Sequence, residues 1–98
     1  MCGAPTQGTA GLEGVDLTTE TVIQGRVLRA DAAVPSAYVR LLDGTGEFTA
    51  EVQTSAEGYF RFFAAPGDWT LRVLSPGGQL EEMIVADIGL TETELHLG

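Results

Sequence analysis

The sequence predicts an all-β fold, a seven-stranded antiparallel β-sandwich, preceded by an N-terminal arm. Short runs of alternating apolar and polar residues recur after residue 20, as expected for strands buried on one face. Turn-forming residues separate these runs, and apolar residues never recur at the three- and four-residue spacing of a helix. Seven short strands in a chain of 98 residues are typical of one sandwich domain.

Five runs alternate clearly, and two weaker ones follow. In chain order they read TVIQGRV, AYVRLL, EFTAEVQT, YFRFFA and DWTLRVLS, and then about Gln79–Val85 and Glu92–Leu97. Because side chains alternate between the two faces of a strand, one set of residues should face the core. This predicted core contains Ile23, Val27, Val39, Leu41, Val52, Phe60, Phe62, Trp69, Leu71 and Val73.

Turn signals lie between the runs. Asp43-Gly44 follows the second strand, and Glu57-Gly58 opens the fourth. Ala65-Pro66-Gly67-Asp68 fits a type II turn, because proline presets φ at the second position and glycine accepts a positive φ at the third. Ser75-Pro76-Gly77-Gly78 marks a further break.

The first 19 residues carry Gly, Thr, Pro and Glu without periodicity. We expect residues 1–19 to form a flexible arm and residues 20–98 to form the domain. A basic start and an apolar segment of the signal-peptide type are missing, and one cysteine cannot form an internal disulfide. These features predict a cytoplasmic protein.

The net charge of the chain indicates which classes of partner are unsuited to it. The formal net charge is −9, with five arginines and no lysine. Such an acidic surface is a poor match for nucleic acid or anionic membranes, and no apolar run approaches the roughly 20 residues of a membrane span. We therefore expect neither nucleic acid nor a membrane as a partner.

The strand pattern resembles the transthyretin-like, or carboxypeptidase regulatory-like, β-sandwich. The matching groups of residues are Gly25-Val27, Ala37-Val39-Leu41, Gly58-Phe60-Phe62 and Pro66-Gly67-Trp69-Leu71-Val73. The Met1-Cys2 start, EFTAEV, FRFFAAPG and WTLR are similar to a small actinobacterial family of unknown function termed SseC-like. That resemblance implies a link to sulfur metabolism, since such proteins are usually encoded beside rhodanese-type thiosulfate sulfurtransferases. It carries over no catalytic residues.

Catalytic signals are weak. His96 is the only histidine, and it should face outward if Leu95 and Leu97 face the core. A lone histidine does not make a metal site of ordinary ligand number, and no serine lies in a nucleophile-elbow motif. No phosphate-binding loop is present either. We expect no enzyme activity, no metal and no cofactor.

Cys2 is the one candidate reactive group. If Met1 is removed, its thiol lies beside a free α-amine, which favours the thiolate. A thiol on a flexible arm would be able to enter a partner's active site and accept sulfane sulfur. The alternatives are a tail whose second residue happens to be cysteine and, ranked last, the first residue of a mature lipoprotein.

The arginines are the candidate binding residues. Arg26, Arg40, Arg61 and Arg72 each lie out of phase with the core, so they should point outward from four strands. If those strands adjoin, the arginines would form a cationic patch for an oxyanion or a carboxylate. The alternative is cross-strand ion pairing with Glu51, Glu47 or the acids at 81–82. Tyr38, Phe63 and Leu74 share the outward phase, a composition typical of an interface or a homodimer contact.

Three functions therefore stay open. The first is a non-enzymatic accessory or binding protein linked to sulfur metabolism, with a rhodanese-type sulfurtransferase as its partner. The second is a sulfur relay in which Cys2 accepts and passes on sulfane sulfur. The third is a purely structural, self-associating module.

Overall fold

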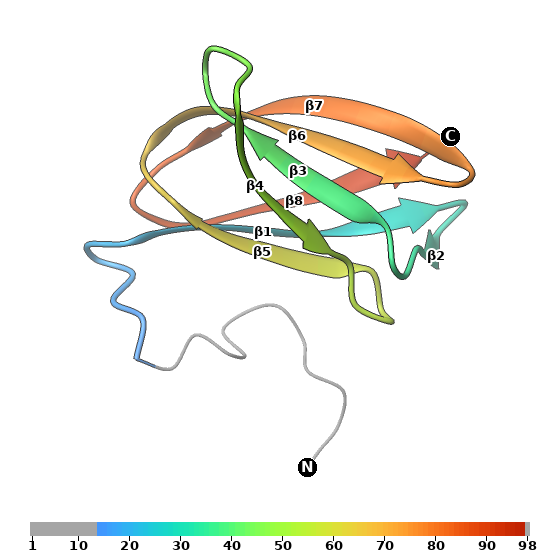
Figure 1. Cartoon of the computed structure of the whole chain (residues 1–98). Helices are drawn as coiled ribbons and strands as arrows, with labels where there is room; N and C mark the ends of the chain where they lie inside the picture. The colour runs from blue at the N-terminus through green and yellow to red at the C-terminus, as the bar shows by residue number, and fades with distance from the viewer. Residues whose placement is uncertain (1–13, 98) are drawn as a thin grey trace.

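The computed structural model describes residues 14–97, which form two β-sheets packed face to face (Figure 1). Within this range no helix is present, so the predicted all-β sandwich is confirmed. The strands are β1 (Thr21–Arg29), β2 (Ala32–Ala33), β3 (Tyr38–Leu42), β4 (Phe48–Gln53), β5 (Tyr59–Ala64), β6 (Gly67–Ser75), β7 (Gly78–Ala86) and β8 (Gly89–Leu97). Sheet A contains β2, β1, β5 and β8, and sheet B contains β4, β3, β6 and β7 in that order.

Sheet A differs in two details from the seven-stranded antiparallel prediction. The additional strand is the two-residue β2, which folds back on the end of β1. In addition, β8 lies parallel to β1 along the whole of both strands. The chain passes from β7 of sheet B to β8 of sheet A through the short connection at residues 87–88 (Figure 1). The other strand pairs are antiparallel.

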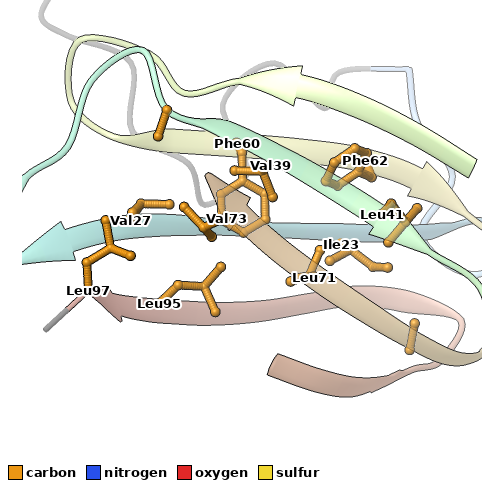
Figure 2. Packing of buried hydrophobic residues seen from close by; sticks show 12 residues of the cluster. Ile23, Val27, Val39, Leu41, Phe60, Phe62, Leu71, Val73, Leu95 and Leu97 are labelled. Atoms are coloured by element: carbon orange, nitrogen blue, oxygen red, sulfur yellow. The ribbon is translucent and has the colours of Figure 1, made fainter. Parts of the chain in front are cut away.

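The core lies between the two sheets, where inward side chains of β1, β5 and β8 meet those of β3 and β6 (Figure 2). Eight of the ten predicted core residues are buried, and Val52 and Trp69 are partly buried against them. The Phe60 and Phe62 rings lie 6.1 Å apart between their centroids and are tilted by 58°, a favourable aromatic arrangement. The alternation of apolar residues therefore predicted the inward face correctly.

Residues 14–20 form an ordered lead into β1. The Asp16 side chain accepts hydrogen bonds from the backbone N–H and hydroxyl of Thr18, at 2.9 and 2.5 Å. The carbonyl of Glu20 accepts a bond from the N–H of Gly89, at 2.7 Å. The bond from Gly89 places Glu20 beside the start of β8, and the bonds within Asp16–Glu20 shape the residues just before β1.

Candidate binding surface

A row of four charged residues crosses the outer face of sheet B. Arg40 on β3 is paired with Glu51 on β4 and with Arg72 on β6, and Arg72 is paired with Glu81 on β7. Residues paired in this way lie side by side on one face of a sheet. The row therefore reads acid, base, base, acid across all four strands.

Each arginine in the row is held by the glutamate on its outer side. Arg40 Nε donates to Glu51 Oε2 at 2.7 Å. Arg72 donates to Glu81 Oε2 from Nε at 2.6 Å and from a terminal nitrogen at 2.5 Å. All four side chains are 30–53% exposed, and exposed pairs of this kind contribute at most about 1 kcal/mol each.

The geometry leaves guanidinium donors available for a ligand. Arg40 engages Glu51 through Nε, so within residues 14–97 both of its terminal nitrogens are uncommitted. Arg72 lies directly opposite on the neighbouring strand. Two adjacent guanidinium groups with free donors suit a carboxylate or another oxyanion, which guanidinium binds through paired hydrogen bonds.

Exposed apolar side chains flank the charged row on both sides. Tyr38 and the half-buried Leu74 form the neighbouring cross-strand pair on one side, and the exposed Phe48 and Met83 lie on the other. The exposed fractions are 48% for Tyr38, 61% for Phe48 and 82% for Met83. The guanidinium carbon of Arg40 lies 5.9 Å from the centroid of the Phe48 ring, within cation–π range. Arginine together with exposed aromatic residues and methionine is the composition of a protein interface.

A cleft of about 330 Å³ continues this surface toward the β3–β4 loop. It is lined by Gly44 from that loop, by Asp68, Trp69 and Thr70 from β6, and by Met83, Ile84 and Val85 from β7. Val85 is 71% exposed. The cleft therefore offers a mostly apolar recess beside the charged row.

Asp43 fixes the loop that borders the cleft. Its Oδ1 accepts hydrogen bonds from the Thr45 hydroxyl at 2.6 Å, the Thr45 N–H at 2.9 Å and the Glu47 N–H at 3.0 Å. These bonds favour the ionised carboxylate, so they hold the pKa of Asp43 below its ordinary value of 3.8, with the Thr45 hydroxyl the largest cause. The loop is consequently anchored at neutral pH.

The four candidate arginines do not form one patch, which corrects the prediction of a single cationic surface. Arg26 and Arg61 belong to sheet A, whereas Arg40 and Arg72 belong to sheet B. Alternation predicts whether a side chain faces inward or outward, but not the sheet to which its strand belongs. Cross-strand ion pairing, the alternative prediction, is observed for both sheet B arginines.

The two sheet A arginines have structural partners. Arg61 Nε donates to Gln24 Oε1 at 2.8 Å, and Gln24 Nε2 donates to Glu92 at 3.1 Å. Arg26 Nε donates to the carbonyl of Glu57 at 2.9 Å, and its guanidinium lies 5.0 Å from the Tyr59 ring centroid. A hollow of about 350 Å³ lies beside Arg26, but Glu92 and Glu94 line it as well, so its charge is less suited to an anion.

Two further predicted residues lie elsewhere. Cys2 falls outside the described residues. His96 is exposed between the buried Leu95 and Leu97, as predicted, and its Nε2 lies 3.3 Å from Glu94. Within residues 14–97 no group of three or more His, Cys, Asp or Glu side chains is placed to hold a metal ion. The same range contains no helix that would be long and apolar enough to cross a membrane.

Sequence reasoning missed three parts of the surface. The alternation in EFTAEVQT puts Phe48 in phase with Val52, which was predicted to face inward, but a register shift between Leu41 and Leu42 places Phe48 beside Arg40 on the outer face. Met83 and Val85 lie outward on β7. The alternation in QLEEMIVA was the available signal for these two, because it also places Glu81 outward.

Residues 2–97 match a protein family described as "Protein of unknown function (DUF1416)". The chain belongs to this family. It is 56% identical over 99 residues to two uncharacterized proteins of Mycobacterium tuberculosis, Rv0814c and Rv3118, covering 99% of this chain and 99% of each relative. It is also 65% identical over 66 residues to an uncharacterized protein of Mycolicibacterium smegmatis, covering 66% of this chain and 73% of that one.

A solved structure confirms the fold. A crystal structure of a DUF3823 family protein from Parabacteroides merdae matches 80% of this chain and 45% of its own, with a TM-score of 0.61 and 19% identity. This chain therefore spans a little under half the length of that protein. At such low identity, the likeness establishes the β-sandwich and nothing about function.

Proposed function

We propose that this DUF1416 chain is a non-enzymatic binding protein whose docking surface is the outer face of sheet B. The observation that carries the proposal is the row Glu51–Arg40–Arg72–Glu81 together with the exposed Tyr38, Phe48 and Met83 beside it. Since the ion pairs contribute little to stability, recognition is the better physical reason for placing arginines among exposed apolar groups.

The partner we propose is a rhodanese-type sulfurtransferase. Support comes from the resemblance of the chain to the SseC-like family, whose members are usually encoded beside such enzymes. The surface adds a chemical requirement: the partner should present an acidic group to Arg40 and Arg72, bordered by apolar residues that cover Phe48 and Tyr38.

Cys2 supplies a second candidate function, a sulfur relay. The family match begins at residue 2, so Cys2 lies within the stretch that the family shares. The Cys2 thiolate would attack the outer sulfur of the enzyme's cysteine persulfide. Cys2 then carries the persulfide, and the enzyme cysteine leaves as a thiolate, so that no external oxidant or reductant is needed.

Calorimetric titration with the rhodanese-type sulfurtransferase of the same organism tests the docking surface. Replacing both Arg40 and Arg72 with glutamine should weaken binding at least tenfold, because both guanidinium contacts are lost. Arg61→Gln is the matched control, since it removes one arginine from the opposite sheet, and it should bind as the unaltered chain does. An equal loss of affinity in the Arg40/Arg72 variant and in Arg61→Gln contradicts the proposal. So does a failure of the unaltered chain to bind the sulfurtransferase.

Intact mass after incubation with thiosulfate and the sulfurtransferase tests the relay. A gain of one sulfur atom, about 32 Da, that disappears in Cys2→Ser supports it. No gain, or a gain that survives in Cys2→Ser, excludes Cys2 as the acceptor. Light scattering on the same samples tests the third function, because a stable dimer without the enzyme would indicate self-association.

A further inference from the structure

One of the two edges of sheet B is formed by β7, which is paired only with β6 among the described strands; β4 forms the other edge. It is continuous over nine residues, Gly78–Ala86, and contains no proline, no lysine and no register shift. Natural proteins usually interrupt or charge an exposed edge, because its unpaired backbone groups otherwise accept another strand. Figure 1 shows β7 as the orange outer strand of its sheet.

The pairing register shows which backbone groups face this edge. The two-residue loop between β6 and β7 makes Ser75 and Gly78 the closing, hydrogen-bonded pair of a hairpin. Hydrogen-bonded and non-hydrogen-bonded pairs alternate along an antiparallel ladder. The N–H and C=O groups directed to the free edge therefore belong to Gln79, Glu81, Met83 and Val85, whose side chains lie on the docking face.

The side chains on this edge define what fits it. Met83 and Val85 are 82% and 71% exposed, and both line the cleft on the docking face. Glu81 receives both of its contacts from Arg72 on Oε2, so among the described residues Oε1 accepts no bond. Glu81, Glu82 and Asp87 lie on or just after β7, which has no basic residue.

We propose that β7 is the site at which an extended segment of the partner adds as a fifth strand of sheet B, with a Lys or Arg beside Glu81 Oε1 and apolar residues beside Met83 and Val85. This inference rests on the proposed docking function and gives its binding mode. Backbone hydrogen bonds to the four edge-directed residues would supply affinity, and the alternating side chains would set the register.

Charge favours a basic partner segment over a second copy of this chain. A second β7 strand would bring the same acidic residues to the edge, and each copy has a formal net charge of −9. Registers that place Glu81 beside Glu81, or Glu82 beside Glu82, face like charges directly, which is destabilising. A partner segment whose basic residue is in phase with its apolar residues would instead place a positive charge beside Glu81.

The neighbouring edge of sheet A is less suited to this role. The exposed outward positions along β8 carry Glu92, Glu94 and His96. Charged side chains of this kind protect an edge strand from pairing. The exposed outward positions along β7 carry one charged residue, Glu81, beside Gln79, Met83 and Val85, so the sheet B edge is the less protected of the two.

Fluorescence anisotropy with two labelled peptides tests the proposal on the full chain. Both are eight-residue Val/Thr peptides of one composition; in one, the single arginine is in phase with the valines, and in the other it is shifted by one position. The in-phase peptide should bind at least tenfold more tightly. Equal or absent binding of both peptides would overturn the proposal.

Edge variants make the test specific. Met83→Pro removes an edge-directed N–H that β6 does not use, and Val85→Lys adds a protective charge; each should reduce binding of the in-phase peptide at least tenfold. Val85→Lys keeps the test valid if Met83→Pro does not fold. If a folded variant binds the in-phase peptide as tightly as the unaltered chain does, the proposal is wrong. It is also wrong if the unaltered chain is a dimer and Val85→Lys makes it monomeric, because a second copy of the chain then occupies the edge.

The sulfurtransferase titration separates this inference from the docking proposal. If Val85→Lys retains full binding to the enzyme while the Arg40/Arg72 variant loses it, strand addition is wrong and the docking face stands. If neither change affects the enzyme while the in-phase peptide still binds, the edge accepts a strand but the proposed partner is wrong.

Discussion

Gly25 in β1 lies where the backbone of β8 and the Phe60 ring leave no room for a side chain. A Cβ at this position would lie 2.2 Å from the carbonyl oxygen of Thr93 and 2.8 Å from the Phe60 ring. The obstructing oxygen is backbone, so β8 itself would have to move. Gly25→Ala should lower the free energy of unfolding by about 1–3 kcal/mol in a urea titration.

Gly44→Ala is the control for this substitution. A Cβ at Gly44 would meet its nearest atoms at 3.6 Å, an ordinary contact, so the change should stay within about 0.5 kcal/mol. Equal destabilisation of the two variants would show that the close approach of β1, β5 and β8 at Gly25 is wrong.

Alternation along a strand predicted whether a single side chain faces the core or the solvent. It identified the buried Ile23, Leu41 and Leu71 and the outward Arg40, Arg72 and His96. It did not identify the partners of those residues, because a cross-strand neighbour depends on sheet order and register. The pairing of Arg40 with Arg72 joins residues 32 positions apart and has no local signal.

One ionised side chain, that of Asp43, contributes hydrogen bonds within the β3–β4 loop. Since the pKa of Asp43 is held below 3.8, its stabilising bonds are fully present above that value and are lost as pH falls through the lower, folded pKa. Thr45→Val removes the largest cause and should move the pKa of Asp43 upward. A carboxyl-carbon NMR titration measures this, and an unchanged pKa would show that the hydroxyl bond is not formed.

The loop of the β1–β2 hairpin has residues that are unfavourable for its backbone conformation. Its loop residues, Ala30 and Asp31, have φ values of 50° and 66°, so both lie in the left-handed region that a type I′ turn requires. Replacing them with Asn and Gly should stabilise the protein by about 1 kcal/mol in thermal or urea unfolding.

Ala56→Asn is the control for the hairpin. Ala56 lies in a turn and does not have a positive φ, so this change should bring no gain. A gain of equal size in both variants would mean that asparagine acts through some property other than the left-handed conformation. The same residues explain why β2 was not predicted, since alanine and aspartate at positions 30 and 31 give no type I′ signal.

Strands separated by clear turn-forming residues were predicted at about their observed positions. Ser75 pairs with Gly78 across the predicted break, whereas Gly67 begins β6 with a φ of 144°, which differs from the roughly +80° of the predicted type II turn. Phe48 shows where prediction from alternation fails. The register shift beside Leu42 turns Phe48 to the other face of the strand, and the sequence pattern contains no sign of this shift.

At the scale of the whole molecule, the distribution of strands between the sheets decides the function that can be proposed. The four outward arginines look equivalent in the sequence, yet two face each side of the sandwich. The parallel partner of β1 is supplied by the last strand of the chain, through pairs such as Val27 with Leu95. Such long-range pairings depend on how the complete core closes, which no short stretch of sequence specifies.

Hydrogen exchange of the full chain, with and without saturating rhodanese-type sulfurtransferase, tests the central claim most directly. If the outer face of sheet B is the docking surface, the partner should slow exchange at the edge-directed amides of β7 and in the β3–β4 loop, while β5 and β8 exchange unchanged. Slower exchange confined to β5 and β8, or no change in any strand at saturation, would contradict the account.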